Sequence, residues 1–266
     1  MDDHVPPPPP AEDPDGLSPP LRRIRTRRRT TVRGDDPAVT EMPLFPLNVV
    51  LFPQMPLPLH VFEERYKEMV NRCIHEGIPF GVVLITEGAA EKARTAPAST
   101  RTCSVGCAAR IAHVERLADG RMNILVVGET RFRILDTHEH CSYRTGITAT
   151  ITDADTPDHD ALPPLTTEVQ KLLRDFLTRS LALAGEKLDT LDLPDDPEPL
   201  SFTVACVLPI ELNEKQELLE ATDTAARLAC ERDILLREVA RLRRAAAARA
   251  PEPVTASRYA ALRSRN

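Results

Sequence analysis

The chain has 266 residues, 42% of them hydrophobic, and carries a formal net charge of −6 at pH 7. This length allows one or two domains with a sizeable core, and the negative charge gives no overall attraction to nucleic acid. No apolar run approaches the roughly 20 residues that span a bilayer, and the proline-rich N-terminus lacks the apolar segment of a signal peptide. We therefore expect a cytoplasmic protein that does not enter membranes.

Residues 1–40 are predicted to form a disordered tail, because few large apolar side chains are present to offset the entropy of ordering. Within this tail, the segment Arg22–Arg33 includes seven arginines. It suits either a basic arm for RNA, DNA or anionic lipid, or a merely solvated segment. The second interpretation is favoured, because no aromatic residue is interleaved to stack on bases.

The segment from Met42 to Tyr66 has short apolar bursts interrupted by prolines. A central strand cannot hold so many prolines, because each removes a backbone donor. We therefore predict one short strand at 49–52, followed by an extended apolar loop from Pro53 to Phe62. From residue 61 the apolar residues recur every three or four positions, which indicates an amphipathic helix ending at Gly77.

The next part of the chain, up to residue 151, predicts short strands with one strong turn signal, Asp119-Gly120, which is typical of a two-residue hairpin. Gly128 is expected to break the strand that follows this turn. Several short strands with one helix indicate a small closed barrel rather than a parallel sheet. The predicted strands are 80–86, 103–113, 114–117, 122–127, 131–135 and 143–151.

The segment 153–164 reads as a solvated linker, and a helical half follows it. Residues 165–183 place their leucines on one stripe, and the last helix is expected at about 223–249. Between them, residues 200–210 are rich in β-forming side chains, so propensity alone favours a strand. Residues 250–266 are predicted to be a second disordered tail.

Several motifs occur together in a recognisable order. PLFPLNVVLFP and LPLHVFEERY are followed by FGVVL, VGCAARI, DGRMNILVVGETRFRIL and EKQELLE. This combination resembles the N-terminal substrate-binding domain of the Lon protease family, over roughly residues 41–245. The resemblance implies an α+β fold with a β-rich, PUA-like pseudobarrel at 41–156 and a helical half at 163–249. It also implies a short buried helix at 200–210 and a binding role in protein quality control.

The sequence lacks the motifs of the catalytic parts of such a protease. It has no GxxxxGK[ST] loop for a nucleotide phosphate, no GxSxG motif, and none of its five lysines lies in the setting of a serine-lysine protease. The chain also ends where the resemblance would place the ATPase module. We therefore expect a free-standing, non-catalytic protein without a cofactor.

A metal site is considered at Cys103 and Cys107. If both cysteines lie in one strand, their sulfurs are about 13 Å apart, which is too far to share a zinc ion. A turn at Val105-Gly106 would keep the metal site possible, but structural cysteines are favoured. The same two cysteines with His113 are the only candidates for an enzyme of unknown type.

The first functional hypothesis is binding of unfolded polypeptides or of a dedicated protein partner. Backbone groups of the loop from Pro53 to Phe62 would accept an added strand, while its apolar side chains offer contacts. Alternatively these side chains plug their own barrel, an interpretation favoured most strongly for Phe62. Arg131 and Arg133, with Glu63 and Glu64, are possible rim groups. The predicted binding residues are Pro56, Leu57, Leu59, His60, Phe62 and Arg131.

The second hypothesis is RNA binding. The resemblance implies a barrel similar to the PUA type of RNA-modifying enzymes, and the arginines of Arg22–Arg33 would supply phosphate contacts. The acidic character of the chain from Pro43 onward counts against it. Binding of nucleic acid would therefore involve only the segment Arg22–Arg33.

Overall fold

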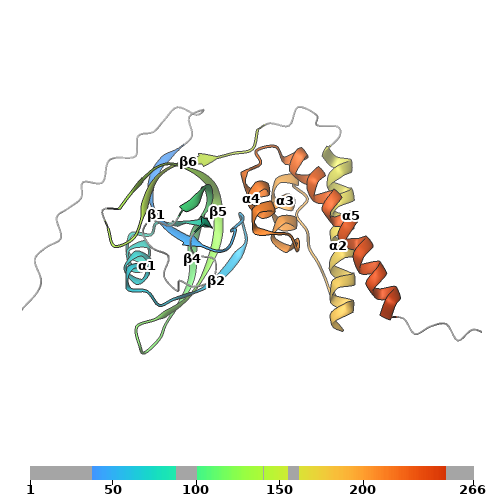
Figure 1. Ribbon diagram of the computed structural model, residues 1–266, viewed down its shortest axis with the longest axis horizontal. Helices are drawn as coiled ribbons and strands as arrows, with labels where there is room; N and C mark the ends of the chain where they lie inside the picture. Colours follow the sequence, from blue (N-terminus) through green and yellow to red (C-terminus); the bar gives the residue numbers. More distant parts are fainter. Residues whose placement is uncertain (1–37, 88–100, 140, 155–161, 250–266) are drawn as a thin grey trace, which may run out of the picture. The chain divides into compact units, whose positions relative to one another are not determined.

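The structure is a computed structural model, and it describes residues 38–87, 101–139, 141–154 and 162–249. The predicted segment Arg22–Arg33, the C-terminal tail 250–266 and most of the N-terminal tail and the 153–164 linker lie outside these residues. Figure 1 labels the elements. The strands are β1 Val39–Leu47, β2 Pro56–Val61, β3 Phe80–Glu87, β4 Arg101–Arg116, β5 Met122–His138 and β6 Thr145–Ile151. The helices are α1 Glu64–Glu76, α2 Leu162–Ala184, α3 Pro197–Val207, α4 Leu212–Glu220 and α5 Thr224–Arg249.

The six strands form one mixed sheet in the order β2-β5-β4-β3-β1-β6. β1 runs parallel to β3, the other pairs are antiparallel, and β6 also pairs with the second half of β5. The pairing of β6 with β5 closes β5, β4, β3, β1 and β6 into a ring, but β2 lies outside this ring, with β5 as its single partner among the described residues, and leaves an open edge. The sheet as a whole is therefore not the predicted closed barrel. The predicted β-rich part with one helix agrees with the strands and with α1.

The prediction for the proline-rich segment is wrong in its placement of the strand. Residues 49–52 form no strand, whereas β1 contains Pro43 and Pro46. β1 pairs with β6 only up to Pro43 and with β3 only from Leu44 onward. Since Leu44 N donates to Arg144 O on the β6 side, and alternate residues face opposite sides, each proline nitrogen faces a side without a paired strand. A central strand therefore holds both prolines without losing a ladder bond.

A hairpin turn at Asp119-Gly120 is confirmed, but its loop has three residues, 118–120, instead of the predicted two, and the predicted break at Gly128 is wrong. Leu117 N donates to Arg121 O, and Gly120 has a φ of 79°, the left-handed conformation that glycine adopts readily. β5 continues through Gly128, where a Cβ atom would collide with the carbonyl oxygen of Phe52. The glycine therefore permits the close approach of another backbone segment within a strand.

The β-rich half has its own apolar core. α1 places Tyr66, Met69, Val70 and Cys73 against the strands and ends, as predicted, at Gly77 in a left-handed conformation. Phe45 stacks on Tyr66 with ring centroids 4.2 Å apart. This core fixes the strand faces, so that one face of β2 and β5 points inward and the other outward.

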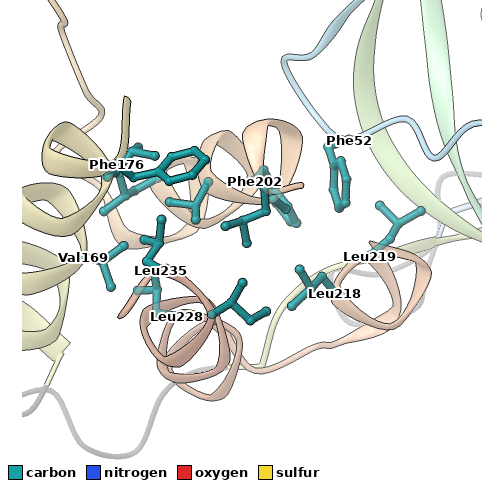
Figure 2. Close-up of a cluster of buried hydrophobic side chains, with 14 of the residues drawn as sticks. Phe52, Val169, Phe176, Phe202, Leu218, Leu219, Leu228 and Leu235 are labelled. Carbon is teal, nitrogen blue, oxygen red and sulfur yellow. The ribbon is translucent and has the colours of Figure 1, made fainter. Parts of the chain in front are cut away.

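Residues 200–207 are helical in α3, as the resemblance implies and against their β propensity. The side chain of Asp196 accepts a hydrogen bond from Glu198 N, and Pro197 occupies the first turn, where its missing N–H costs nothing. A second apolar cluster joins the helices to Phe52, and Figure 2 shows Phe52 beside Phe202 with Leu218 and Leu219 nearby. The Phe52 and Phe202 ring centroids are 6.4 Å apart. Among the described helices, none is both long and apolar enough to cross a membrane.

Candidate functional site

β2 carries four of the six predicted binding residues, and its side chains alternate between two environments. Leu57 and Leu59 are half-buried against the core of the β-rich half, on the same face as buried Val61. Pro56 and His60 are exposed on the opposite face. The two leucines therefore pack against the core of their own domain. This agrees with the alternative that these side chains fill the protein's own interior instead of contacting a partner.

The outward face of β2 continues into an apolar surface. Pro58 lies opposite Leu125 of β5, which is 37% exposed. Phe62 follows directly after β2 and is 46% exposed, and its ring centroid is 6.1 Å from that of His60. The interpretation that Phe62 plugs the barrel is therefore wrong. We define the outer patch as Pro56, Pro58, His60, Phe62 and Leu125.

A polar row borders the outer patch. His60 Nδ1 lies 2.7 Å from Asn123 Oδ1, and Asn123 Nδ2 donates to Glu115 at 2.8 Å. These bonds link β2, β5 and β4 and fix the imidazole next to Phe62. Leu125 and Asn123 were missed by the sequence analysis. The alternation in MNILVV, whose even residues Met122, Ile124 and Val126 are buried, was the signal that places them outward.

The backbone of β2 does not suit the predicted addition of a strand. Gly128 N donates to Met55 O, so in the register of the two strands the backbone N–H and C=O groups of Leu57 and Leu59 point toward β5. The backbone groups of the alternate residues of β2 point away from β5, toward the open edge. Two of these outward residues are Pro56 and Pro58, which have no N–H. Prolines at an exposed edge prevent pairing with another strand, so this edge offers side chains rather than hydrogen bonds.

Arg131 does not belong to the outer patch, which corrects its prediction as a rim group. Its side chain is 2% exposed and donates to Leu219 O at 2.9 Å and to the Asp153 carboxylate. Arg227 donates to the other oxygen of Asp153 at 2.6 Å. The predicted rim glutamates have other partners: Glu63 pairs with Arg65 and Glu64 with Lys67.

The guanidinium groups of Arg131 and Arg227 also lie over the Phe202 ring, 5.1 and 4.3 Å from its centroid. Burial lowers the pKa of Arg131, and it would raise the pKa of Asp153, but hydrogen bonds from Arg227 and Thr224 and the two positive charges hold that pKa below its usual value. The cluster therefore keeps Asp153 ionised and joins β5 to α5.

One carboxyl group near this cluster is not compensated. Glu231 is fully buried one turn after Arg227, and neither of its oxygens has a hydrogen-bond partner among the described residues. Burial raises the pKa of Glu231 well above its usual value, and Arg227 opposes this only in part. The carboxyl group is therefore neutral over a pH range in which an exposed glutamate is charged.

The cysteine candidates do not form a chemical site. Cys103 and Cys107 lie in one continuous strand, β4, without the turn that a metal site needs, and burial raises the pKa of Cys107 to about 12. His113 is ten residues beyond Cys103 in the same strand, about 30 Å away. In the part of the chain that the structure describes, no group of three or more metal-ligating side chains gathers.

Most of the chain is similar to a known protein family. The family model of the ATP-dependent protease La (LON) substrate-binding domain matches residues 41–237. The Lon protease of Escherichia coli K12 is 29% identical over 192 residues, which cover 71% of this chain and 24% of that protein. The Lon protease of Xanthomonas oryzae pv. oryzae is 27% identical over 193 residues, covering 72% of this chain and 22% of that protein. The chain thus spans about a quarter of the length of these relatives.

Solved structures show the same relationship. The crystal structure of a Lon N-terminal domain protein from Xanthomonas campestris aligns with a TM-score of 0.53 and 26% identity, covering 71% of this chain and 95% of that one. The N-terminal domain of the Mycobacterium avium complex Lon protease shares the fold, with a TM-score of 0.56 and 22% identity over 74% of this chain and 98% of that one. The family match covers well over half of the sequence, so this chain belongs to the LON substrate-binding domain family.

Proposed function

We propose that this chain is a non-catalytic module that binds unfolded polypeptides, or an exposed segment of one dedicated protein partner, through the outer patch. The observation that carries the proposal is the exposure of Phe62 and Leu125 on one face of the β2–β5 pair, in a domain of a substrate-binding family. Exposed apolar groups that cluster on a rigid face are typical of protein-binding surfaces. The absent nucleotide-binding and protease motifs support a role in binding rather than in catalysis.

The size of the outer patch fits weak, adaptable binding. Fully burying a Phe or Leu side chain contributes about 1.5–3 kcal/mol, and Phe62 and Leu125 are each about half-exposed or less. Their combined contribution of roughly 1–2.5 kcal/mol is too small for a tight complex by itself, since a micromolar dissociation constant corresponds to about 8 kcal/mol. Several apolar segments of one unfolded chain, or additional contacts elsewhere on the domain, would supply the rest.

The test is fluorescence anisotropy of the whole chain with a labelled, reduced and carboxymethylated protein that cannot fold. Saturable binding is expected to survive high salt, because the contacts are apolar. The double change Phe62→Ser and Leu125→Ser should weaken binding at least about fivefold. The matched control is Leu135→Ser, which removes another exposed leucine of β5 and should change binding less than about twofold.

Two results would contradict the proposal. One is equal binding by the double variant and the control, and the other is no binding of the unfolded protein by the unchanged chain. A labelled single-stranded RNA serves as the second probe, because the RNA hypothesis depends on Arg22–Arg33, which lie outside the described residues. RNA binding that falls steeply with salt and disappears when residues 1–37 are deleted would place that activity in the arginine-rich segment.

A further inference from the structure

β4 is longer than the strand beside it. It pairs with β3 from Arg101 to Ala109, and there β3 begins, at Phe80. Beyond Ala109, β4 continues to Arg116 and pairs with β5 alone among the described residues. The side of β4 that faced β3 is therefore open over residues 110–116, a second sheet edge besides that of β2.

The register identifies which backbone groups face this open side. Leu117 N donates to Arg121 O at the hairpin, so the backbone N–H and C=O groups of Leu117 and Glu115 point toward β5. The backbone groups of every second residue point to the opposite side. Val114 and Arg116 thus face away from β5. Ile111 lies opposite Val126, a residue whose backbone faces β2, so Ile111 also faces the open side, beyond a bulge at residue 112. None of these three residues is proline.

A pocket of about 660 Å³ lies beside this open stretch of β4. This volume is within the range of about 300–1,000 Å³ that ligand sites occupy. The end of α1 and the segment Gly77–Pro79 form its other wall, and the ion pair of Arg110 with Glu129, at 2.7 Å, lies at the pocket. Ile74 is 41% exposed there, so part of the apolar wall is uncovered. The apolar lining includes Cys73, Ile74, Ile78, Ile111 and Val114.

We propose that an extended polypeptide segment adds to β4 at Ile111–Arg116 as a further strand, and that one of its apolar side chains enters this pocket. A polypeptide is the occupant that fits, because a peptide backbone presents donors and acceptors at the spacing that an open strand edge requires. Six residues of strand span about 17–20 Å, which is enough for a short segment. The apolar lining and the paired charges of Arg110 and Glu129 favour an uncharged side chain in the pocket.

This inference takes its class of ligand from the proposed function, but it concerns a different site and a different kind of contact. The outer patch offers side chains on an edge where prolines remove the donors. The β4 edge offers backbone groups without prolines. The bulge at residue 112 limits the continuous paired run to Val114–Arg116, with Ile111 reached across the irregularity. The added strand is therefore short.

The first test uses the whole chain and a fluorescein-labelled octapeptide of alternating valine and threonine. Two further peptides carry backbone N-methyl groups, on the valines in one and on the threonines in the other. Strand addition uses the N–H groups of one set only, so one methylated peptide should bind at least about tenfold more weakly while the other stays within about threefold of the parent. Equal binding by all three peptides would overturn the proposal, and so would an equal loss for both methylated peptides.

Amide hydrogen exchange locates the contact. The amides of Val114 and Arg116 should exchange quickly in the free protein and become at least about tenfold slower with saturating parent peptide. The amide of Glu115, which faces β5, serves as an internal control and should be slow in both states. Unchanged exchange at Val114 and Arg116 in the peptide complex would contradict the assignment of the site.

A pair of variants at one position separates the backbone from the side chain. Val114→Pro removes the outward N–H without removing a bond to β5, whereas Val114→Ala makes a similar loss of side chain and keeps the N–H. The proline variant should lose at least about tenfold in affinity for the octapeptide, and the alanine variant less than about threefold. If circular dichroism shows that the proline variant does not fold, the methylated peptides decide the question with the unchanged protein.

The two proposals fail in distinguishable ways. Binding of the carboxymethylated protein that depends on Phe62 and Leu125, without any protection at Val114 and Arg116, would overturn strand addition and leave the proposed function standing. Binding of the octapeptide at β4, with no binding of the unfolded protein, would overturn the proposed function and keep the strand-addition site.

Discussion

Arg227 of α5 donates a hydrogen bond of 2.6 Å to Asp153, 74 residues earlier in the chain, and neither side chain is more than 7% exposed. Asp153 follows the last strand and also accepts a hydrogen bond from Arg131 of β5. Sequence reasoning placed Asp153 in a solvated linker and Arg131 on a binding rim, because neither residue has a partner nearby in the sequence. Charged residues that meet only in the folded chain leave no local pattern.

The first prediction concerns this carboxylate. Asp153→Asn leaves two buried guanidinium groups without a negative partner, which typically costs about 3–5 kcal/mol. We expect a large fall in the free energy of unfolding measured with urea. Glu64→Gln is the control: it removes an ion pair to Lys67 from a glutamate that is 89% exposed, and should cost less than about 1 kcal/mol. Similar costs for the two variants would show that the cluster contributes no more than a surface pair.

The second prediction concerns the neutral carboxyl group of Glu231. Because burial raises its pKa in the folded state, the folded chain binds a proton that the unfolded chain releases above its ordinary value of about 4.5. The stability that this proton uptake gives the folded chain is fully present below pH 4.5, the ordinary value. It is lost as the pH rises through the raised pKa of the folded state. The free energy of unfolding therefore falls by at most about 1.4 kcal/mol per pH unit through this one group.

Glu231→Gln keeps the neutral shape of the protonated side chain at every pH. We expect the unchanged protein to lose stability between pH 5 and pH 8 relative to the variant. The difference in the free energy of urea unfolding, variant minus unchanged protein, should therefore be larger at pH 8 than at pH 5. Two thiols interact with this carboxyl group: Cys206, whose pKa burial raises to about 11, and Cys230, whose pKa burial also raises, so neither loses its proton in this interval. Parallel pH profiles for the two proteins would mean that the Glu231 carboxyl group ionises normally.

A third prediction tests the close approach at Gly128. Gly128→Ala would place a methyl group against the carbonyl oxygen of Phe52, which belongs to the chain backbone and cannot rotate away. Overpacking of this kind typically costs about 1–3 kcal/mol. Thermal unfolding should therefore show a clear decrease in Tm, whereas Thr130→Ala, at an exposed site of the same strand, should change Tm little. An unchanged Tm for Gly128→Ala would indicate that the two backbones separate easily.

Much of the fold follows from local signals in the sequence. The three- and four-residue period of α1, its glycine end at Gly77 and the hairpin at Asp119-Gly120 were each predictable, because each depends on neighbouring residues. The prolines misled the prediction for β1. Whether a proline disrupts a strand depends on which side its nitrogen faces and whether a partner lies there, and both depend on distant strands. Gly128 was predicted to break a strand, but it is needed because the backbone of Phe52, distant in the sequence, approaches closely there.

The candidate site was predictable only in part. The sequence identified the apolar residues of Pro53–Phe62, but it predicted a loop where the strand β2 forms, and it did not say which face points outward. That choice follows from the register with β5, since shifting a strand by one residue exchanges its two faces. It makes Leu57 and Leu59 part of the core and exposes Phe62. The open edge of β4 had no sequence signal, because it results from the difference in length between two strands that pair across a loop.

The last prediction separates the two faces of β2 by experiment. Leu59→Ser should cost roughly 1–3 kcal/mol of stability, because Leu59 packs against the core, while affinity for the carboxymethylated protein should change little at temperatures where the variant is folded. Phe62→Ser should leave stability within about 0.5 kcal/mol and weaken binding. Urea unfolding and anisotropy on the same samples give both quantities. If Leu59→Ser weakens binding more than Phe62→Ser while the protein remains folded, the inward face of β2 opens during binding, and the outer patch is not the surface that meets the polypeptide.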